Sequence, residues 1–332
     1  MADPLPPLTS QSQLKSLAVL KGHDGVVNDL SWSPDGKHIA TASKDEAVFV
    51  WDVAGLTRPS DPDITKGSDA PLQSNTIASS AVIRTNHQVR AVAWSGDGSL
   101  LAIAGGYDGS VMLWSPRTRS VVATLNGHKG SVTCLSWSPD SKQLASSSKD
   151  NQCKVWDVAQ RAVAATLRGN AEGVNAVAFC PDGLHIATGG DDRKTRVWSI
   201  VTEELCANMR ADSYSINGVA WSPAGGQLAA LDCVSSVLLW DVRDKTLLHT
   251  LKGDNIRIAP TKLSFSPDGR LLAVPRGERV RLLDVARWSE VAELHGHAGQ
   301  VTAAAFSPDG SLVATASEDG TARVWGTASV QL

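Results

Sequence analysis

Cysteine is scarce in this sequence and shows no pairing pattern. The five cysteines include no CxxC pair: Cys134, Cys153, Cys180, Cys206 and Cys233. An odd number of scattered cysteines disfavours a disulfide framework, and the eight histidines show no spacing typical of metal ligands. The sequence therefore predicts a protein of a reducing compartment, the cytoplasm or alternatively the nucleus, that uses no metal or other cofactor.

The chain also lacks an excess of one charge and a long apolar run. Its 31 Lys and Arg stand against 34 Asp and Glu, a net charge of −3, so there is no basic footprint for nucleic acid and no polybasic membrane anchor. No apolar run approaches the roughly 20 residues that span a bilayer. The N-terminal stretch MADPLPPLTSQSQ has no Arg and no apolar core, so we expect neither a signal peptide nor a transit peptide.

What the sequence does have is a repeat. The stretch GHKGSVTCLSWSPDSKQLASSSKDNQCKVWDV, residues 127–158, returns about seven times in stronger or weaker copies. The copies close on Trp51, Trp114, Trp156, Trp198, Trp240, Leu283 and Trp325, at steps of 63, 42, 42, 42, 43 and 42 residues. A period of about 40–45 residues is typical of a β-propeller. Since no single repeat can bury its own faces, the array predicts one domain.

Each copy has the pattern of four short strands. In the third copy, apolar runs at 132–137, 144–148, 153–158 and 162–167 are separated by turn sequences such as SPDSK and KDNQ. The first run of each copy is apolar at nearly every position, which is typical of a strand buried on both faces. Small residues share one position in this run: Ala91, Ala176, Gly218 and Ala303. We interpret them as a sign of crowding near the propeller axis.

The motif GH…LSWSPDG…LAS…D…VWDV resembles the WD40 repeat family over nearly the whole chain. The resemblance implies an all-β fold, a seven-bladed β-propeller of four-stranded antiparallel blades. We expect a tail at residues 1–12, a single propeller at 13–326 and a second tail at 327–332. Residues 53–80 are expected to form an insertion between the third and fourth strands of blade one.

The register of the repeats predicts how the ring closes. The last copy ends at Trp325, and the GTASVQL that follows is too short for a convincing fourth strand. The stretch QLKSLAVLKGH before the first copy matches RSVVATLNGH before the third. Residues 14–20 should therefore form the outer strand of the last blade, so that an N-terminal strand completes this blade and removes free edges.

A histidine, a hydroxyl, an aspartate and a tryptophan recur together in three copies. The resemblance implies that each set forms a hydrogen-bonded network inside its blade. The sets are His23, Thr41, Asp45 and Trp51; His128, Ser146, Asp150 and Trp156; and His297, Thr315, Asp319 and Trp325. The hydroxyl could instead come from two residues later, at Ser43, Ser148 or Ser317.

These sets hold the residue types of a hydrolase, but their repetition argues against catalysis. A catalytic site needs one exposed nucleophile beside one base and an oxyanion site. A network that recurs in three blades, each time closed by a buried indole, instead satisfies buried polar groups. We therefore predict that the protein is not an enzyme.

The other four copies depart from this pattern. The second has Ala104 in place of the hydroxyl, and the fourth has Asn170 in place of the histidine. The fifth has Val234 for the turn aspartate, and the sixth has Gly277 there and Leu283 for the tryptophan. Because such networks contribute most when complete, we expect blades five and six to be the loosest, or to be held by something outside the chain.

Function is expected on a surface. WD40 propellers typically act as platforms for peptides and protein domains, often on the face that carries the tight turns before the third strands. The resemblance places these residues on that face: Lys44, Arg90, Tyr107, Lys149, Gln88, Asn28, Thr133 and Arg276. Arg90 and Tyr107 share a blade and are flanked by two lysines, which makes a positive arc over blades one to three. The arc is either a solvated rim of mixed charge or a site for an acidic or phosphorylated segment.

Three functions follow from these patterns. The first, which we favour, is a non-enzymatic protein-interaction scaffold, a subunit of a larger complex that binds peptides or proteins on a propeller face. The second is a substrate receptor of a cullin-type ubiquitin ligase, because WDVR at Trp240–Arg243 resembles the WDxR signature of such receptors, although Val234 stands where that signature expects Asp. The third, an RNA-associated subunit, is disfavoured by the net charge.

Overall fold

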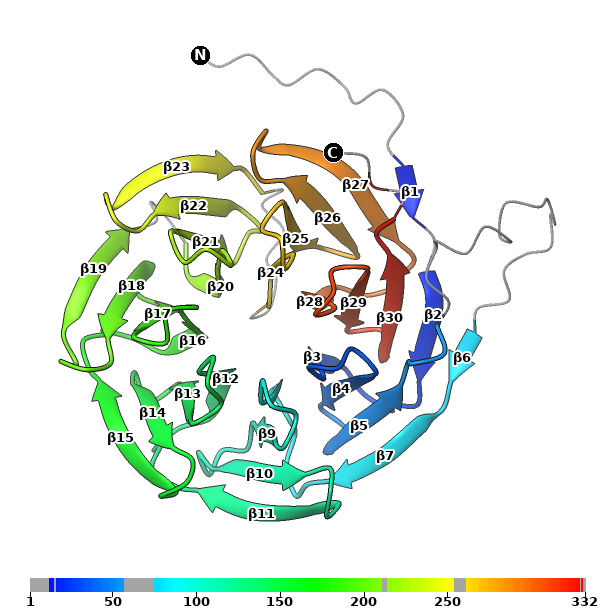
Figure 1. The fold of residues 1–332 in the computed structure, drawn as a ribbon, viewed down its shortest axis with the longest axis horizontal. Coiled ribbons are helices and arrows are strands. Elements are labelled where there is room, and N and C mark those ends of the chain that lie inside the picture. Colours follow the sequence, from blue (N-terminus) through cyan, green and yellow to red (C-terminus); the bar gives the residue numbers. More distant parts are fainter. Residues whose placement is uncertain are drawn as a thin grey trace.

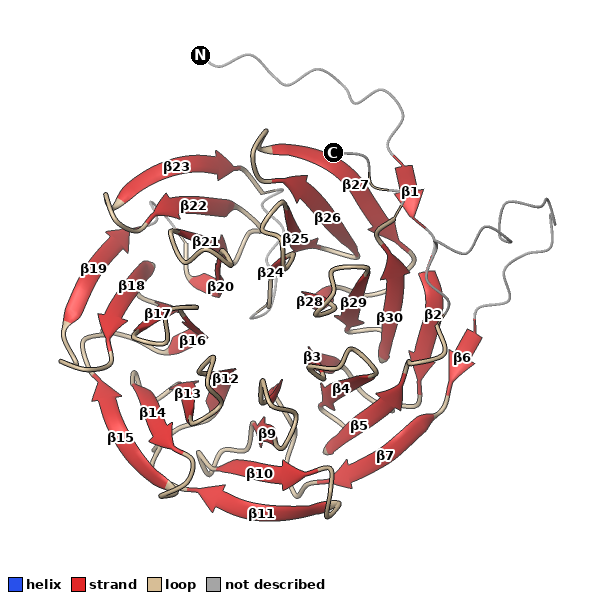
Figure 2. Cartoon of the chain, viewed as in Figure 1, coloured by secondary structure: helices blue, strands red, loops and turns tan. Residues whose placement is uncertain are grey.

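The computed structural model describes residues 12–14, 16–56, 75–210, 214–253, 261–328 and 330. Within these residues the chain forms seven β-sheets arranged as blades around a central axis (Figure 1). The first strand of each blade lies nearest the axis and the fourth lies on the outer wall. The described residues consist of strands and loops (Figure 2). The predicted seven-bladed β-propeller is therefore confirmed.

The first four blades follow one another along the chain. Blade one contains β3 (Val27–Trp32), β4 (His38–Ser43), β5 (Ala47–Asp52) and β7 (Ser79–Arg84). Blade two contains β8 (Ala91–Trp94), β9 (Leu101–Ala104), β10 (Val111–Ser115) and β11 (Ser120–Leu125). Blade three contains β12 (Val132–Trp137), β13 (Gln143–Ser148), β14 (Cys153–Asp157) and β15 (Ala162–Leu167). Blade four contains β16 (Val174–Phe179), β17 (His185–Gly190), β18 (Lys194–Ser199) and β19 (Leu205–Arg210).

The last three blades complete the ring. Blade five contains β20 (Ile216–Trp221), β21 (Gln227–Asp232), β22 (Val237–Asp241) and β23 (Thr246–Leu251). Blade six contains β24 (Ser264–Phe265), β25 (Leu271–Arg276), β26 (Arg279–Asp284) and β27 (Ser289–His295). Blade seven contains β28 (Val301–Phe306), β29 (Leu312–Ser317), β30 (Thr321–Gly326) and the N-terminal β2 (Ser16–Lys21).

Strand β2 closes the ring as predicted. It pairs antiparallel with β30, with Leu20 opposite Ala322, and it buries Ala18 and Leu20 completely. Because the first and last parts of the chain share one sheet, blade seven cannot form until both are present. This pairing satisfies the edge of β30, which would otherwise present unpaired backbone groups.

Two short strands that the sequence did not predict lie on the outer wall. Strand β1 (Ser12–Leu14) pairs in parallel with β27, and β6 (Asn75–Ile77) pairs in parallel with β2. Strand β6 comes from the end of the expected 53–80 insertion, whose residues 57–74 lie outside the described part of the chain. The same holds for residues 1–11, 329 and 331–332 of the expected tails. Blades six and seven therefore each carry a fifth strand (Figure 1).

The inner strands show why one of their positions often holds a small residue. A Cβ on Gly218 would collide with the carbonyl oxygen of Thr261 in the next blade, so glycine is required there. The same position nevertheless holds Asp29 in blade one, Cys134 in blade three and Lys262 in blade six. The expected crowding is real at Gly218, but three blades place a longer side chain into the channel at this level.

Candidate functional site

Three blades contain the complete tetrad, in the same geometry. In blade three, His128 Nδ1 lies 2.8 Å from Asp150 Oδ2 and His128 Nε2 lies 2.8 Å from Ser146 Oγ, while Trp156 Nε1 donates to Ser146 Oγ at 2.8 Å. The corresponding three distances are 2.8, 2.7 and 2.9 Å in blade one and 2.9, 2.8 and 2.9 Å in blade seven. Each hydroxyl thus connects an imidazole to a buried indole.

The alternative hydroxyl two residues later has a different role. Ser148 donates to the carbonyl of Gly130 at 2.9 Å and accepts the backbone N–H of Asp150 at 3.1 Å. Ser43 and Ser317 make the equivalent bonds in blades one and seven. These serines therefore hold the tight turn that carries the aspartate, and the tetrad hydroxyl is the earlier one.

Burial and hydrogen bonding set the ionisation of the tetrads. Burial alone would raise the pKa of Asp150, but the hydrogen bonds from His128 and from the backbone N–H of Lys129 lower it to about 2. Burial lowers the pKa of His23 and of His297 below the ordinary 6.5, despite the partner carboxylates. The tetrads of blades one and seven are therefore each a neutral imidazole against a carboxylate at pH 7. The tetrad hydroxyls of Thr41, Ser146 and Thr315 belong to fully buried residues, so no substrate can reach them.

Blade four replaces the tetrad histidine with an arginine from elsewhere in the blade. Arg196, two residues before the closing tryptophan, forms a buried ion pair with Asp192 at 2.7 Å and donates to Asn170 Oδ1 at 2.9 Å. Trp198 still donates to Thr188 at 2.9 Å. The replacement of the histidine by Asn170 was expected from the sequence, but the role of Arg196 was not. The same position also holds Lys154, Arg281 and Arg323 in other blades, so a cation there did not by itself mark the replacement.

Blade five lacks the hydroxyl and shows the consequence. Ala230 occupies the position that holds the tetrad hydroxyl Thr41 in blade one, and the buried Nε1 of Trp240 has no hydrogen-bond partner among the described residues. Asp232, two residues before Val234, instead accepts the backbone N–H of Val234 at 2.9 Å and of Ser236 at 2.7 Å. The turn is therefore held by its own aspartate, without a link to a histidine.

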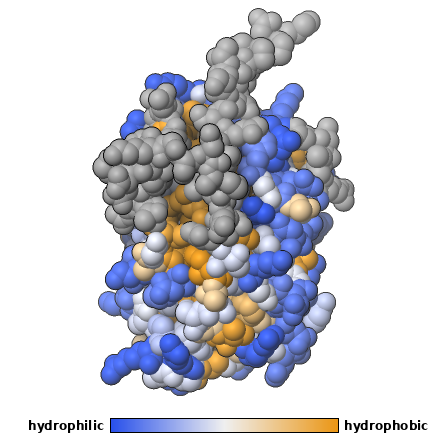
Figure 3. Space-filling view, turned by 90° about the vertical axis from the view of Figure 1, so that its right-hand side faces the viewer, coloured by the Kyte–Doolittle hydropathy of each residue, from blue (hydrophilic) through white to orange (hydrophobic). Residues whose placement is uncertain are grey.

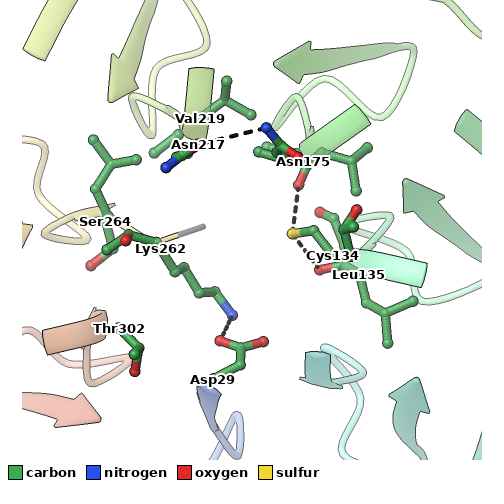
Figure 4. A pocket seen from close by; sticks show the side chains of 18 of the residues that line it. Asp29, Cys134, Leu135, Asn175, Asn217, Val219, Lys262, Ser264 and Thr302 are labelled. Atoms are coloured by element: carbon green, nitrogen blue, oxygen red, sulfur yellow. Dashed lines mark hydrogen bonds and ion pairs between the residues drawn. The ribbon is translucent and has the colours of Figure 1, made fainter. Parts of the chain in front are cut away.

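A cavity of about 450 Å³ occupies the central channel. One end is lined by polar side chains of the inner strands, and the other by Phe179, Trp221 and Phe265. Between them Lys262 reaches from blade six to blade one, where Nζ lies 3.4 Å from Asp29 Oδ1 and donates to the carbonyl of Leu30 at 3.1 Å (Figure 4). Burial raises the pKa of Asp29, and the charge of Lys262 opposes this. The pair thus ties blade six to blade one across the channel.

Side chains at the polar end of the channel link neighbouring blades. Each stands one residue after the first buried residue of its inner strand and donates to the next blade's backbone. Thr302 donates to the carbonyl of Val27, Asn28 to Val89, and Thr133 to Val174, each at 2.6 Å, and Asn175 to Ile216 at 3.1 Å. Asn28 and Thr133, two of the residues expected to bind a partner, therefore use these donors inside the ring.

Arg90 breaks this pattern. It occupies the linking position of blade two, lines the channel mouth with Gln88 and Lys44, and its buried Nε has no hydrogen-bond partner among the described residues. Lys44 is exposed, and the Tyr107 side chain is 76% exposed at the tight turn of blade two. The structure thus places four of the expected partner-binding residues on one face, over blades one and two.

The two remaining residues of the expected set behave differently. Lys149 lies 2.8 Å from Asp191 and donates to Asn175 Oδ1 at 2.7 Å, so much of its charge is balanced within the molecule. Arg276, at the end of β25, is half-buried and does not line the channel mouth. Over blade three the charge of Lys149 is therefore paired with Asp191, whereas Lys44 and Arg90 form no ion pair among the described residues.

The described residues also bear on two other kinds of site, metal centres and membrane spans. No group of three or more His, Cys, Asp or Glu there has the arrangement of a metal site. None of the described residues belongs to a helix long and apolar enough to cross a membrane.

Comparison with known proteins gives the family. The model of the WD domain, G-beta repeat matches residues 14–52, 80–115, 119–157, 162–199 and 288–326. The chain belongs to the WD40 repeat family. The unmatched stretch between 199 and 288 contains β19 of blade four, all of blade five and the first three strands of blade six. In blades five and six the turn aspartate is replaced in both and the closing tryptophan in one. The structure nevertheless forms both blades of this WD40 propeller, with four strands in blade five and, counting β1, five in blade six.

Similar proteins match only part of this WD40 chain. Protein HIR1 of Aspergillus oryzae is 30% identical over 42% of this chain and 13% of its own length. Protein HIR1 of Cryptococcus neoformans is 32% identical over 42% of this chain and 15% of its own length. The 66 kDa stress protein of Physarum polycephalum is 30% identical over 44% of this chain and 21% of its own length. The chain thus corresponds to a minor part of each relative.

Proposed function

We propose that the protein is a non-enzymatic interaction scaffold, a WD40 subunit of a larger assembly in the cytoplasm or nucleus. Its binding face is the one that carries the tight turns, and the site is the channel mouth over blades one and two. The ligand is an acidic or phosphorylated segment of a partner protein.

The observation that supports this site is the free Nε of Arg90. In four other blades the equivalent side chain donates to the neighbouring backbone, whereas Arg90 Nε is buried without a partner in the described residues. A buried donor left without an acceptor costs about 1–3 kcal/mol. A ligand carboxylate or phosphate would remove this cost, and guanidinium groups bind such anions in paired hydrogen bonds.

The surroundings of Arg90 fit the same ligand. Lys44 adds a second positive charge at the mouth, and Gln88 adds an amide. The exposed ring of Tyr107 offers an apolar wall, and tyrosine and arginine are enriched at binding hot spots. Glu318 lines the mouth from blade seven, so an acidic ligand is repelled from that side and directed towards blades one and two.

The test is a pull-down from native lysate with the double variant Lys44→Glu/Arg90→Glu. Its matched control is Arg117→Glu/Lys142→Glu, which makes the same change in net charge at two exposed turns on the opposite face. The first variant should lose partners that wild type and control retain, with phosphatase treatment distinguishing acidic from phosphorylated partners. If the folded variant recovers the same partners at the same yield, the channel mouth is not the binding site.

The ubiquitin-ligase alternative rests on Arg243, which is exposed in the turn between β22 and β23, at the other end of its blade from the tight turn. The same pull-down separates the two functions. A cullin adaptor that is recovered with wild type and lost with Arg243→Ala would favour the receptor function.

A further inference from the structure

The outer strands of the blades share one register. In each blade, the residue two positions before the closing Trp or Leu pairs with one residue of the outer strand. These outer-strand residues are Val82, Thr124, Thr166, Asn208, Thr250, Glu293 and Val19, in blades one to seven. They are therefore equivalent points on seven edges of the outer wall.

Two of these points already carry an added strand from the chain itself. Strand β1 is centred on Glu293, which pairs with Gln13, and β6 is centred on Val19, which pairs with Thr76. Both added strands are three residues long and run parallel to the strand that they cover. The outer wall thus accepts an extended segment at the same register and in the same direction at both places, and Figure 1 shows the two added strands on the outside of blades six and seven.

At a third one of these equivalent positions, a side chain accepts the outward backbone N–H. The backbone N–H of Thr166 donates to Glu203 Oε2 at 3.2 Å. Glu203 lies in the turn before β19 of the next blade, with a positive φ of 57°. Arg119 occupies the same turn position in blade two, with φ of 52°, and faces β7 of blade one. A carboxylate therefore caps the edge of β15, and a guanidinium stands at the corresponding place beside β7.

The space beside β7 is a cleft of about 350 Å³. Val82 and Ile83 form one wall, Arg119 and Val121 form the other, and Trp114 also lines it. Val82 and Val121 are each almost half exposed, and Arg119 is the single charged residue in the lining. Figure 3 shows apolar surface on the side of the propeller where β6 and β7 lie. Exposed apolar edges of this kind are sites for strand addition.

We propose that the outer edge of β7 binds an extended segment of a partner protein as an added parallel strand centred on Val82. Because β7 and β15 have the same register, the N–H of Val82 faces the same way as that of Thr166, towards the incoming segment. An apolar side chain of the segment enters the cleft beside Val121, and a carboxylate of the segment pairs with Arg119. This site is separate from the channel mouth.

The test uses two fluorescein-labelled peptides, acetyl-DDVTVTVD-amide and its basic counterpart acetyl-KKVTVTVK-amide, with binding measured by fluorescence anisotropy. Wild type should bind the acidic peptide saturably and the basic one about tenfold more weakly. Val82→Pro removes the outward N–H, a change that an edge strand tolerates, and should weaken binding about tenfold or more. Thr166→Pro is the matched control and should bind like wild type, because its edge is already capped.

A second variant keeps the test decisive if Val82→Pro lowers the melting temperature. Arg119→Glu copies the residue found at the same turn position of blade four, so the turn should be retained, and it should abolish binding of the acidic peptide. Failure of the acidic peptide to saturate wild type would overturn the proposal, as would equal binding by the two proline variants. Binding that survives both β7 variants but falls with Lys44→Glu/Arg90→Glu would assign the peptide to the channel mouth instead.

Discussion

Replacing Asp150 with alanine tests the structural role of the tetrads. Asp150 accepts hydrogen bonds from His128 Nδ1 at 2.8 Å and from the backbone N–H groups of Lys129 at 2.9 Å and Gln152 at 3.0 Å. The two backbone groups lie in surface turns, where water can replace the carboxylate. The His128 side chain is fully buried, so its N–H would lose its partner without gaining water.

The expected cost follows from that orphaned donor. A buried group left without its partner destabilises a fold by about 1–3 kcal/mol, and bonds to a charged acceptor lie towards the upper end. We expect Asp150→Ala to lower the free energy of unfolding by about 2–3 kcal/mol. The matched control is Asp140→Ala in the same blade, because Asp140 also bonds a hydroxyl and a turn N–H but is more than half exposed. That change should cost about 0.5 kcal/mol.

The assay is urea unfolding followed by tryptophan fluorescence at pH 7, with His128→Ala and the double variant completing the cycle. The double variant should cost less than the sum of the single ones, by about 1 kcal/mol or more. The cost of Asp150→Ala should also shrink as the pH falls from about 4 to 2, because a pKa lowered from 3.8 to about 2 stabilises the fold only above that window. Equal costs at Asp150 and Asp140, or additive effects in the cycle, would refute the reasoning.

Three further predictions concern the ring as a whole. Removing residues 1–21 deletes β2 and exposes the edge of β30, so the protein should become insoluble or melt at a clearly lower temperature in a thermal shift assay; unchanged melting would contradict the closure. Lys262→Met removes the ion-pair partner of the buried Asp29 carboxylate, which keeps only the backbone N–H groups of Leu30 and Val92. The change should cost about 3 kcal/mol and speed hydrogen exchange in blade six, whereas Asp29→Asn added to it should restore part of the loss; no restoration would speak against the pair. His23 and His297 have lowered pKa values, so the stability they provide is complete above pH 6.5 and is lost as the pH falls through their folded pKa values; NMR titration of the two imidazoles above 6.5 would contradict this.

The repeat made most of the fold predictable. A period of 42 residues fixed by the closing tryptophans gives the number of blades, and the match between residues before the first copy and before the third gives the closure by β2. The tetrads are visible because four residues recur at the same spacing inside a single blade. Each of these inferences needs sequence positions that are near one another or that repeat.

Other features were hidden because they depend on the closed ring. Lys262 and Asp29 are 233 residues apart in the sequence. The one sequence signal for their pairing was that both charged residues occupy the inner-strand position that holds Ala or Gly in the other blades except blade three. Arg196 was missed because blade four pairs its buried turn aspartate with an arginine from another sequence position and not with a histidine. Strand β6 was missed because an insertion has no counterpart in the other repeats from which its pairing could be read.

The most direct test of the account is where a partner touches the propeller. A photo-crosslinking amino acid placed at Tyr107, which is exposed on the tight-turn face, is compared with one at Leu184, which is exposed in a turn on the opposite face. We predict that partners from native lysate crosslink at Tyr107 and not at Leu184, and that Lys44→Glu/Arg90→Glu removes the adduct. Crosslinking at Leu184 alone, or an adduct at Tyr107 that is unchanged in the charge-reversed variant, would contradict the assignment of the binding face.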